Sequence, residues 1–230
     1  MSAKGSGGHL AEVLQGTGWI LLDFDGPVCS VFAGYPAKTI AAELRDWITH
    51  EGVHLPRISD DPHDVLRQSA ELSGNLRRQV EARLCSAEIR AVATAAPTPG
   101  ADTFLAACQA TQRPVAIVSN NAAGAIRSYL DRMGLARLIS HVEGRNRRNS
   151  ALMKPHPHSL IAATKVLRAT VASTVFIGDS TSDMQAGAAA GVLSVGYANK
   201  PGKRDWLADA GAAVVVEDMA SLAAALTDPR

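Results

Sequence analysis

The sequence predicts an α/β protein in which a parallel sheet carries helices on both faces and an all-α segment is inserted after the first strand. Three observations lead to this fold class. Short runs of Val, Ile and Leu without polar alternation are typical of strands that are buried on both faces. Segments with apolar residues every three or four positions alternate with these runs and predict helices. Between about residues 30 and 96, three helical patterns occur and no strand-like run does.

Five strand-like runs end abruptly in polar residues. The first, Trp19–Asp23, precedes the helical segment. The later runs are Pro114–Ser119, Thr174–Asp179, Val192–Gly196 and Ala213–Val216, and a fainter run at Leu138–Val142 predicts a sixth strand. Because strands that alternate with helices are joined by right-handed crossovers, we expect one open sheet with both faces covered.

Five amphipathic stretches supply the helices that cover this sheet. They are Ala101–Thr111, Ala122–Met133, Pro157–Arg168, Met184–Ala190 and Ser221–Leu226. Gly134 and Gly191 directly follow two of them, at the position where helices commonly end in glycine.

The segment between the first and second strands predicts three helices of its own. Their patterns cover about Ala37–Glu51, Pro62–Leu72 and Leu76–Ala95, and Pro97–Gly100 then closes the segment in the manner of a linker. We therefore assign residues 1–28 and 98–230 to an α/β core and residues 29–97 to an inserted helical domain. The first residues, Met1–Gly8, lack an apolar stretch behind them and predict an unstructured lead-in, not a signal peptide.

Composition excludes several classes of protein. With 230 residues, 47% hydrophobic and 20% charged, the chain is typical of a globular protein and not of a disordered one. A net charge of +1 and 4% aromatic residues argue against a nucleic-acid binder. No stretch approaches the ~18 apolar residues of a membrane span. Three dispersed cysteines, Cys29, Cys85 and Cys108, indicate a reduced, cytoplasmic chain without disulfides or a zinc site.

Two pairs of aspartates stand at the ends of predicted strands. Asp23 and Asp25 end the first run, where a period of two places them on one face, and Gly26 permits a sharp turn after them. Asp179 and Asp183 follow a later run at a spacing of four, which brings them together as a helix begins. Carboxylates that converge at one sheet edge without His or Cys favour Mg²⁺ over zinc. A helix cap or an Asx turn is the structural alternative for either of the later aspartates alone.

Two further strand ends carry candidate anion-binding groups. The second run ends in Ser119, Asn120 and Asn121, which offer a hydroxyl and backbone N–H groups before a predicted helix, although a helix cap would use the same residues. Lys154 precedes Pro155 and Pro157, which restrict the local backbone. A solvated surface lysine is the alternative there.

These residues together resemble the four motifs of the haloacid dehalogenase-like (HAD) hydrolase superfamily, in the family's order. The motifs are Asp23-Phe-Asp25-Gly26, Ser119-Asn120, Lys154-Pro155 and Gly178-Asp-Ser-Thr-Ser-Asp183. The resemblance covers nearly the whole chain and is strongest to the phosphoglycolate phosphatase-like branch. It implies a Rossmann-like parallel sheet and identifies the helical insert with the family's C1-type cap.

The resemblance also implies phosphoryl transfer through an aspartyl-phosphate. Asp23 would attack phosphorus, and Asp25 would act first as general acid and then as general base. Ser119 and Lys154 would hold the transferring phosphoryl group.

Gly26 and Asn120 would belong to the same phosphate-binding loops. Mg²⁺ would be bound by Asp23, the Asp25 backbone carbonyl and Asp179, with Asp183 in support.

The insert and one basic loop supply weaker candidates. Polar residues of the insert that are candidates for substrate contact are His54, His63, Arg67, Arg77, Arg78 and Arg83. The loop Arg145–Arg148 is typical of a mobile, solvated loop, with attraction of an anionic substrate or a nucleic acid as the alternative.

The combined expectation is a Mg²⁺-dependent phosphatase acting on a small phosphorylated metabolite, either a sugar phosphate or a phospho-acid. In the family, an acid two positions after the nucleophile, here Asp25, separates phosphate-ester chemistry from attack on carbon and from phosphonate cleavage. A phosphomutase and a non-enzymatic interaction protein on the same scaffold are the alternatives. We expect no membrane or nucleic-acid partner, and the sequence carries no prediction of the oligomeric state.

Overall fold

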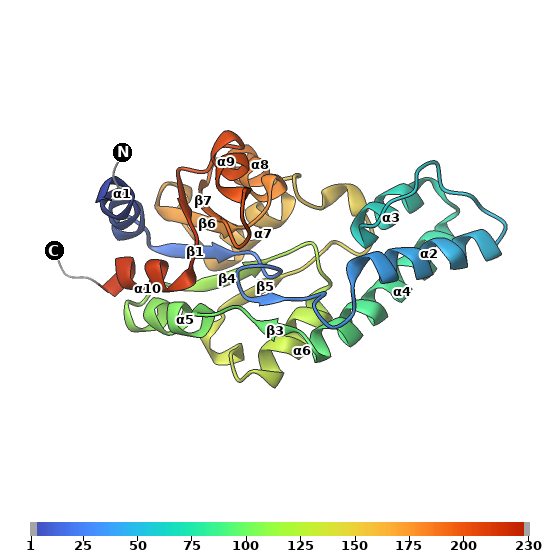
Figure 1. The fold of residues 1–230 in the computed structure, drawn as a ribbon, viewed down its shortest axis with the longest axis horizontal. Helices are drawn as coiled ribbons and strands as arrows, with labels where there is room; N and C mark the ends of the chain where they lie inside the picture. The colour runs from blue at the N-terminus through green and yellow to red at the C-terminus, as the bar shows by residue number, and fades with distance from the viewer. Residues whose placement is uncertain (1–3, 228–230) are drawn as a thin grey trace.

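The structure, a computed structural model, describes residues 4–227 and contains a six-stranded parallel sheet between layers of helices (Figure 1). The strand order is β5-β4-β1-β6-β7-β8, and every neighbouring pair is parallel. The strands are β1 (Trp19–Leu22), β4 (Val115–Val118), β5 (His141–Glu143), β6 (Thr174–Gly178), β7 (Leu193–Tyr197) and β8 (Val214–Val216). All six predicted strands are present, with the fainter one displaced towards Glu143.

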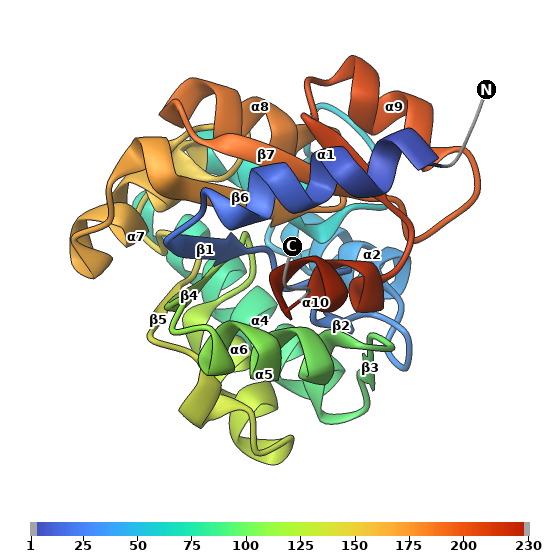
Figure 2. The same ribbon diagram turned by 90° about the vertical axis from the view of Figure 1, so that its left-hand side faces the viewer.

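Both faces of the sheet are buried, as the uninterrupted apolar runs predict. Ile20 and Leu22 of β1 pack into one hydrophobic cluster, whereas Leu21 between them packs into another. Figure 2 shows α5 and α6 on one side of the sheet and α8 and α9 on the other. The first layer consists of α1 (Lys4–Gln15), α5 (Ala101–Ala110), α6 (Ala123–Arg132) and α10 (Met219–Thr227), and the second of α7 (His158–Leu167), α8 (Thr181–Ala190) and α9 (Lys203–Asp209).

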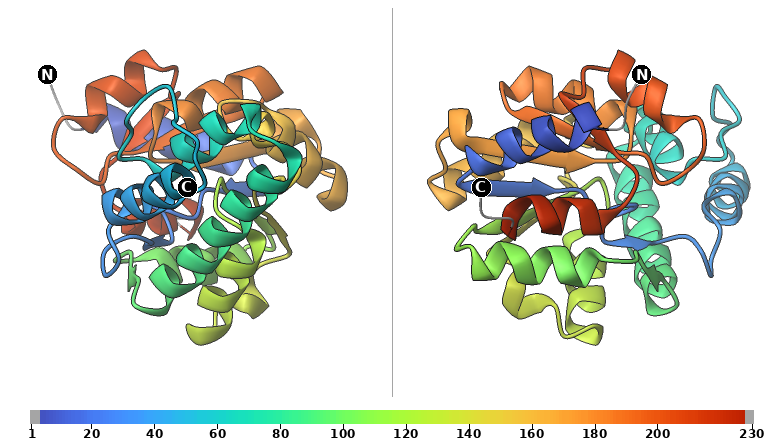
Figure 3. Two further views of the ribbon diagram at one scale, coloured as in Figure 1. Left: turned by 90° about the vertical axis from the view of Figure 1, so that its right-hand side faces the viewer. Right: turned by 60° about the vertical axis from the view of Figure 1, so that its left-hand side comes forward.

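A helical insert separates β1 from the rest of the sheet. It comprises α2 (Ala37–His50), α3 (Pro62–Gln68), a 3₁₀ turn (Ser69–Glu71) and α4 (Gly74–Ala93), so the three predicted helices are confirmed. The arrow of β1 points towards these helices in Figure 1, and they lie in front of the sheet in the left view of Figure 3. The insert therefore lies beyond the carboxyl ends of the strands.

A two-stranded antiparallel ladder joins the two connections of the insert. It pairs β2 (Cys29–Ser30) with β3 (Ala96–Pro97), and the Thr98 N–H donates to the Val28 carbonyl at 3.0 Å beside it. Strands of two residues leave no periodic pattern, which is why the sequence did not predict them. The ladder lies at the boundaries 28/29 and 97/98, and the division into core and inserted domain at these positions remains our proposal.

The N-terminal segment differs from the expectation. Of the predicted lead-in, residues 1–3 lie outside the described part, but Lys4–Gly8 belong to α1, so the prediction of an unstructured segment is wrong there. Leu10 and Leu14 of this helix are buried in the cluster that includes α10. Within residues 4–227, no helix combines the length and the apolar character needed to cross a membrane. All three cysteines are free thiols.

Candidate active site

The polar residues that follow the strands line one cavity of about 410 Å³ at the carboxyl ends of β1, β4 and β6, with α3 of the insert on its other side. The lining residues are Asp23, Asp25, Asp61, His63, Arg67, Ser119, Asn120, Asn121, Lys154, Pro155, Asp179, Ser180, Ser182 and Asp183. Of the predicted catalytic, phosphate-binding and metal-binding residues, all except Gly26 are among them. All the lining residues except Pro155 are polar or charged, so the cavity is built for a hydrophilic ligand.

Lys154 joins two of the predicted motifs. Its Nζ lies 2.8 Å from Asp23 Oδ1 and 2.6 Å from Asp183 Oδ1, and it donates to the Val118 carbonyl at 3.1 Å. The residue is only 2% exposed, which contradicts the alternative of a solvated lysine. Burial lowers the pKa of Lys154, but the carboxylates of Asp183 and Asp23 outweigh this effect and raise it above its usual value. The ammonium group therefore stays charged at neutral pH.

Asp183 uses its two carboxylate oxygens in different ways, one in a helix cap and the other in an ion pair with Lys154. Its Oδ2 accepts from the Ser180 hydroxyl at 2.7 Å and from the backbone N–H groups of Asp179 and Ser180, closing a capping box at the start of α8. The N-cap residue of α8 is thus Ser180, and Asp183 takes part in the cap as the third residue of the helix. This arrangement leaves Oδ1 directed at Lys154. A Cβ atom on Gly178 would lie 2.5 Å from that of Asp183, so this close turn requires glycine.

Asp179 is held by two residues that sequence reasoning missed. Lys203 Nζ lies 2.6 Å from Asp179 Oδ2, and Asn199 Nδ2 donates to the same oxygen at 2.8 Å. Both residues follow β7 and stand at least 20 positions further along the chain. No motif spacing links them to Asp179, and only the neighbouring position of β6 and β7 in the sheet could have suggested the contact.

The loop after β1 turns sharply at Gly26. The strand ends at Leu22, and the Asp25 Oδ1 atom accepts from the Val31 N–H at 2.9 Å. Gly26 has a φ of +108°, and a Cβ there would lie 2.5 Å from Asp179 Cγ. Its own N–H donates to the Cys29 carbonyl at 2.8 Å. Gly26 therefore allows the first and fourth motifs to meet.

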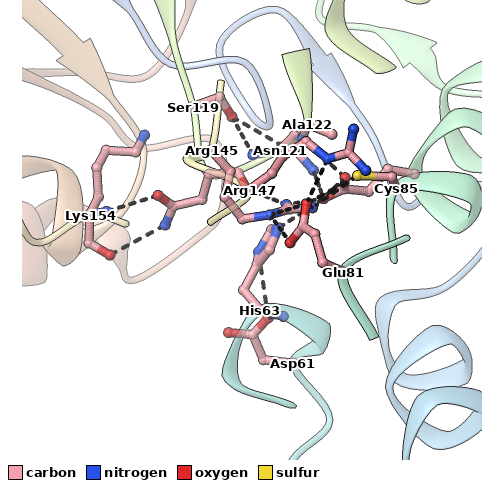
Figure 4. Close-up of polar contacts among 12 residues, drawn as sticks. Asp61, His63, Glu81, Cys85, Ser119, Asn121, Ala122, Arg145, Arg147 and Lys154 are labelled. Carbon is pink, nitrogen blue, oxygen red and sulfur yellow. Dashed lines mark hydrogen bonds and ion pairs between the residues drawn. The ribbon is translucent and has the colours of Figure 1, made fainter. Parts of the chain in front are cut away.

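The loop after β4 presents Ser119, a buried residue. The Ser119 hydroxyl donates to Asn121 Oδ1 at 3.1 Å, and the Asn121 N–H donates back to Ser119 Oγ at 3.2 Å (Figure 4). Asn120 uses its side-chain amide on Lys154, accepting from the backbone N–H at 2.8 Å and donating to the carbonyl at 3.3 Å. The helix that follows is capped by Ala122 without a side-chain bond, so neither Ser119 nor Asn120 is its cap. Asn121 lies at the predicted strand end, but its buried contact with Ser119 was not predicted from the sequence.

Burial changes the acidity of the first two aspartates. It raises the pKa of Asp23, helped by the Asp183 carboxylate and opposed by the Lys154 ammonium group. Burial also raises the pKa of Asp25 to about 6, although the Val31 N–H works against the rise. Asp25 is thus a carboxyl group that can change protonation state near neutral pH.

Three of the carboxylates fit a divalent cation. Oxygen atoms of Asp23, Asp179 and Asp183 all lie within 4.8 Å of one another. Asp23 Oδ2 and Asp179 Oδ1 accept no hydrogen bond from any residue in the described range 4–227. The cavity lining has an excess of carboxylates over cationic side chains, and these hard oxygen donors are of the kind that binds Mg²⁺.

The insert contributes Asp61, His63 and Arg67 to the cavity. Asp61 caps α3 by accepting from the His63 N–H at 2.9 Å, and Arg67 Nη2 donates to the Lys154 carbonyl at 3.0 Å. Of the six predicted contact residues of the insert, only His63 and Arg67 line this cavity. Arg83 instead stacks over Trp47, 4.2 Å from the ring centroid, in a separate groove between α2 and α4.

Arg145 contradicts the prediction of a solvated basic loop. Its side chain is fully buried and pairs with Glu81 at 3.0 Å (Figure 4). It also pairs with Glu88 at 2.7 Å, and both glutamates lie on α4. Arg147 and Arg148 of the same loop are exposed, with Arg147 3.5 Å from Glu81. The sequence signal for this contact is the placement of two glutamates seven residues apart on the face of α4 that buries Leu84.

A family model described as haloacid dehalogenase-like hydrolase matches residues 18–191. The chain belongs to this family. Among curated relatives, the phosphoglycolate phosphatase of Rhodospirillum rubrum is 33% identical over 135 residues, which are 57% of this chain and 53% of the relative. That of Escherichia coli is 34% identical over 96 residues, 42% of this chain and 37% of the relative. The match therefore spans about half or less of the length of these relatives.

Solved structures of other HAD-like hydrolases share the fold. A protein from Haemophilus somnus described as a predicted phosphoglycolate phosphatase has a TM-score of 0.64 at 21% identity, with 90% of this chain and 96% of that chain covered. A HAD family hydrolase from Deinococcus radiodurans, solved with bound phosphate and sodium, has a TM-score of 0.61 at 26% identity, with 91% and 95% covered. The predicted α/β fold class is confirmed.

Proposed function

We propose that this HAD-like hydrolase is a Mg²⁺-dependent phosphatase that hydrolyses a small phosphorylated metabolite through an aspartyl-phosphate on Asp23. The observation that carries the proposal is the convergence of Asp23, Asp25, Ser119 and Lys154 on one hydrophilic cavity. The phosphoglycolate phosphatases among the relatives support the same reaction class.

Asp23 is proposed as the nucleophile. Its carboxylate oxygen forms a bond to phosphorus while the bond from phosphorus to the leaving oxygen breaks, and water then cleaves the acyl phosphate in a second displacement. The ion pair with Lys154 at 2.8 Å holds the Asp23 carboxylate in place at the end of β1. Lys154 also offsets the negative charge that the substrate brings to this acidic cavity.

Asp25 is proposed as the general acid and base. The Val31 N–H holds one carboxylate oxygen, which leaves Oδ2 to exchange the proton. A pKa of about 6 suits both halves of the reaction, because the group must first protonate the leaving oxygen and then accept a proton from water.

Ser119 and Lys154 are proposed to hold the phosphoryl oxygens, with Asn120 and Gly26 shaping the two loops that carry them. Asp23, Asp179, Asp183 and the Asp25 backbone carbonyl are the groups that would hold Mg²⁺. Bound there, Mg²⁺ would neutralise charge that develops on the transferring phosphoryl group.

The dimensions of the cavity favour a small, hydrophilic leaving group. Its volume of about 410 Å³ must hold the phosphate as well, and among residues 4–227 Pro155 is the only apolar residue that lines it. A sugar phosphate or a phospho-acid fits these limits better than a phosphorylated lipid does. Because α3 borders the same cavity, we propose that residues 29–97 act as a cap that excludes water and selects the substrate.

Hydrolysis of p-nitrophenyl phosphate with and without Mg²⁺ tests the proposal. Wild-type protein is expected to release phosphate only when Mg²⁺ is present, and Asp23→Asn is expected to be inactive while retaining the wild-type circular dichroism spectrum. Turnover by a folded Asp23→Asn variant would rule out the nucleophile. A screen of sugar phosphates and phospho-acids should yield free phosphate, whereas an isomerised sugar phosphate would identify a phosphomutase.

A further inference from the structure

Glu88 of the insert is a completely buried carboxylate that binds groups from three other parts of the chain. Its partners His63, Asn121 and Arg145 are labelled in Figure 4. Its Oε1 atom accepts from Arg145 Nη1 at 2.7 Å, from His63 Nε2 at 3.1 Å and from Asn121 Nδ2 at 3.3 Å. Its Oε2 atom accepts from the Ala122 N–H at 3.0 Å and from Arg145 Nη2 at 3.2 Å. Although burial raises the pKa of Glu88, Arg145 and His63 outweigh this effect and lower it to about 2, so the group is ionised at neutral pH.

One branch of these contacts runs to the phosphate-binding loop of the core. The Asn121 side chain donates to Glu88 through its nitrogen and accepts from the Ser119 hydroxyl through its oxygen. This fixes the orientation of the Asn121 amide and hence the position of the Ser119 side chain. Ala122, whose N–H donates to Glu88, is the N-cap residue of α6. A carboxylate at this end of a helix also interacts favourably with the helix dipole.

The second branch runs to the substrate side of the cavity. An ionised carboxylate only accepts hydrogen bonds, so His63 Nε2 must carry a proton in its contact with Glu88. The opposite ring nitrogen, Nδ1, lies 3.7 Å from Asp61 Oδ1, and both residues line the cavity. Glu88 thereby sets which edge of the His63 ring the ligand meets.

We propose that Glu88 is a positioning residue that holds Ser119 for phosphate binding and orients His63 toward the leaving group of the substrate. This inference rests on the proposed phosphatase function. Because Glu88 belongs to α4 and Ser119 to the core, the phosphate-binding loop takes this form only while α4 packs against it. The insert then completes the machinery of the core in addition to covering it.

Glu81 offers a matched control within the same ion-pair network. It also lies on α4, is buried and pairs with Arg145, at 3.0 Å. It makes no hydrogen bond to His63, Asn121 or Ala122 within the described residues. Glu81→Gln therefore disturbs Arg145 while leaving both branches from Glu88 intact.

The decisive experiment compares Glu88→Gln and Glu81→Gln in urea unfolding and in p-nitrophenyl phosphate hydrolysis with Mg²⁺. Both variants should unfold at a lower urea concentration than wild type, because each removes one of the two carboxylates that pair with Arg145. In Glu88→Gln an amide nitrogen replaces one carboxylate oxygen, so the side chain loses its acceptor either for Ala122 or for His63 and Asn121. In either orientation kcat should fall about 10- to 100-fold, the scale of a misplaced reacting group. Glu81→Gln should keep kcat within about twofold of wild type, less than misplacement costs. A folded Glu88→Gln with wild-type kcat overturns the proposal, as does an equal loss of kcat in both variants.

A second measurement does not depend on turnover. The ring proton on His63 Nε2 should give a protected NMR signal in wild type and in Glu81→Gln, and that signal should be lost or shifted in Glu88→Gln. An unchanged His63 signal in Glu88→Gln also overturns the proposal. If wild-type protein hydrolyses no phosphate ester, the proposed function fails by itself, and the His63 signal together with binding of inorganic phosphate to the two variants still decides the role of Glu88.

Discussion

Gly26 is a residue at which the loop after β1 closely approaches Asp179. Its φ of +108° is strained for any other residue, and a Cβ atom would meet Asp179 Cγ at 2.5 Å. We therefore expect Gly26→Ala to displace Asp179, to weaken Mg²⁺ binding and to reduce phosphatase activity. Isothermal titration with Mg²⁺ and steady-state kinetics measure the two effects.

Gly52 provides the control for backbone strain alone. It has a φ of +79°, and nothing lies within 4 Å of its Cβ position. Gly52→Ala should cost about 1 kcal/mol of stability and leave Mg²⁺ affinity unchanged. If the two variants lose Mg²⁺ affinity equally, the contact with Asp179 is not what demands glycine at position 26.

At the level of single residues, the sequence predicted the groups that stand at strand ends and missed their partners. The sequence predicted Asp23, Ser119 and Asp179 because each directly follows a strand. The carboxyl ends of parallel strands lie at one edge of the sheet, so residues that follow different strands lie close together there. Asn199 and Lys203 were missed because their contacts with Asp179 depend on packing between segments that no periodic pattern links. Asn120 was predicted to bind phosphate, but its side-chain amide forms hydrogen bonds with the backbone N–H and carbonyl of Lys154.

At the level of secondary structure, α4 carries two buried glutamates, Glu81 and Glu88, that pair with Arg145. A carboxyl group with a lowered pKa contributes stability above the pKa of the unfolded chain and loses it as pH falls through the folded value. For Glu88 the contribution is full above pH 4.5 and disappears towards a pH of about 2. The difference between these two pKa values corresponds to about 3 kcal/mol.

Urea denaturation at several pH values tests this contribution. Glu88→Gln should be less stable than wild type by about 3 kcal/mol at pH 7, and the gap should narrow at pH 4 and further at pH 3. Glu217, an exposed partner of Arg204 at 2.9 Å, is the control, and Glu217→Gln should differ from wild type by less than about 1 kcal/mol. A gap for Glu88→Gln that stays constant from pH 7 to pH 3 would contradict the lowered pKa.

Prediction of whole elements succeeded where burial imposes a pattern. The strands are apolar throughout because both faces are covered, and the helices of the insert show an amphipathic period because each buries one side. Helix α1 has three glycines, at positions 5, 7 and 8, which lower helix propensity, and its place depends on Leu10 and Leu14 packing. Helix α9 buries only Leu207, so it has no apolar stripe to detect.

At the level of the whole molecule, an almost neutral chain encloses a strongly acidic cavity. The net charge is +1, yet five of the residues that line the cavity are aspartates, against the two cations Arg67 and Lys154. Such an arrangement of like charges opposes folding unless a cation shares the site. The stability of the entire protein should therefore depend on divalent metal.

Mg²⁺ at a hundredfold excess over its dissociation constant should raise the unfolding temperature by about 5–10 °C for a chain of this size. NaCl at equal ionic strength should produce a much smaller rise, because it screens the aspartates without binding between them. Asp179→Asn should lose most of the response to Mg²⁺. Asp46→Asn, which alters an exposed aspartate on α2, should keep it. Differential scanning calorimetry of the three proteins measures these shifts, and an undiminished response in Asp179→Asn would place the cation outside the Asp23, Asp179 and Asp183 cluster.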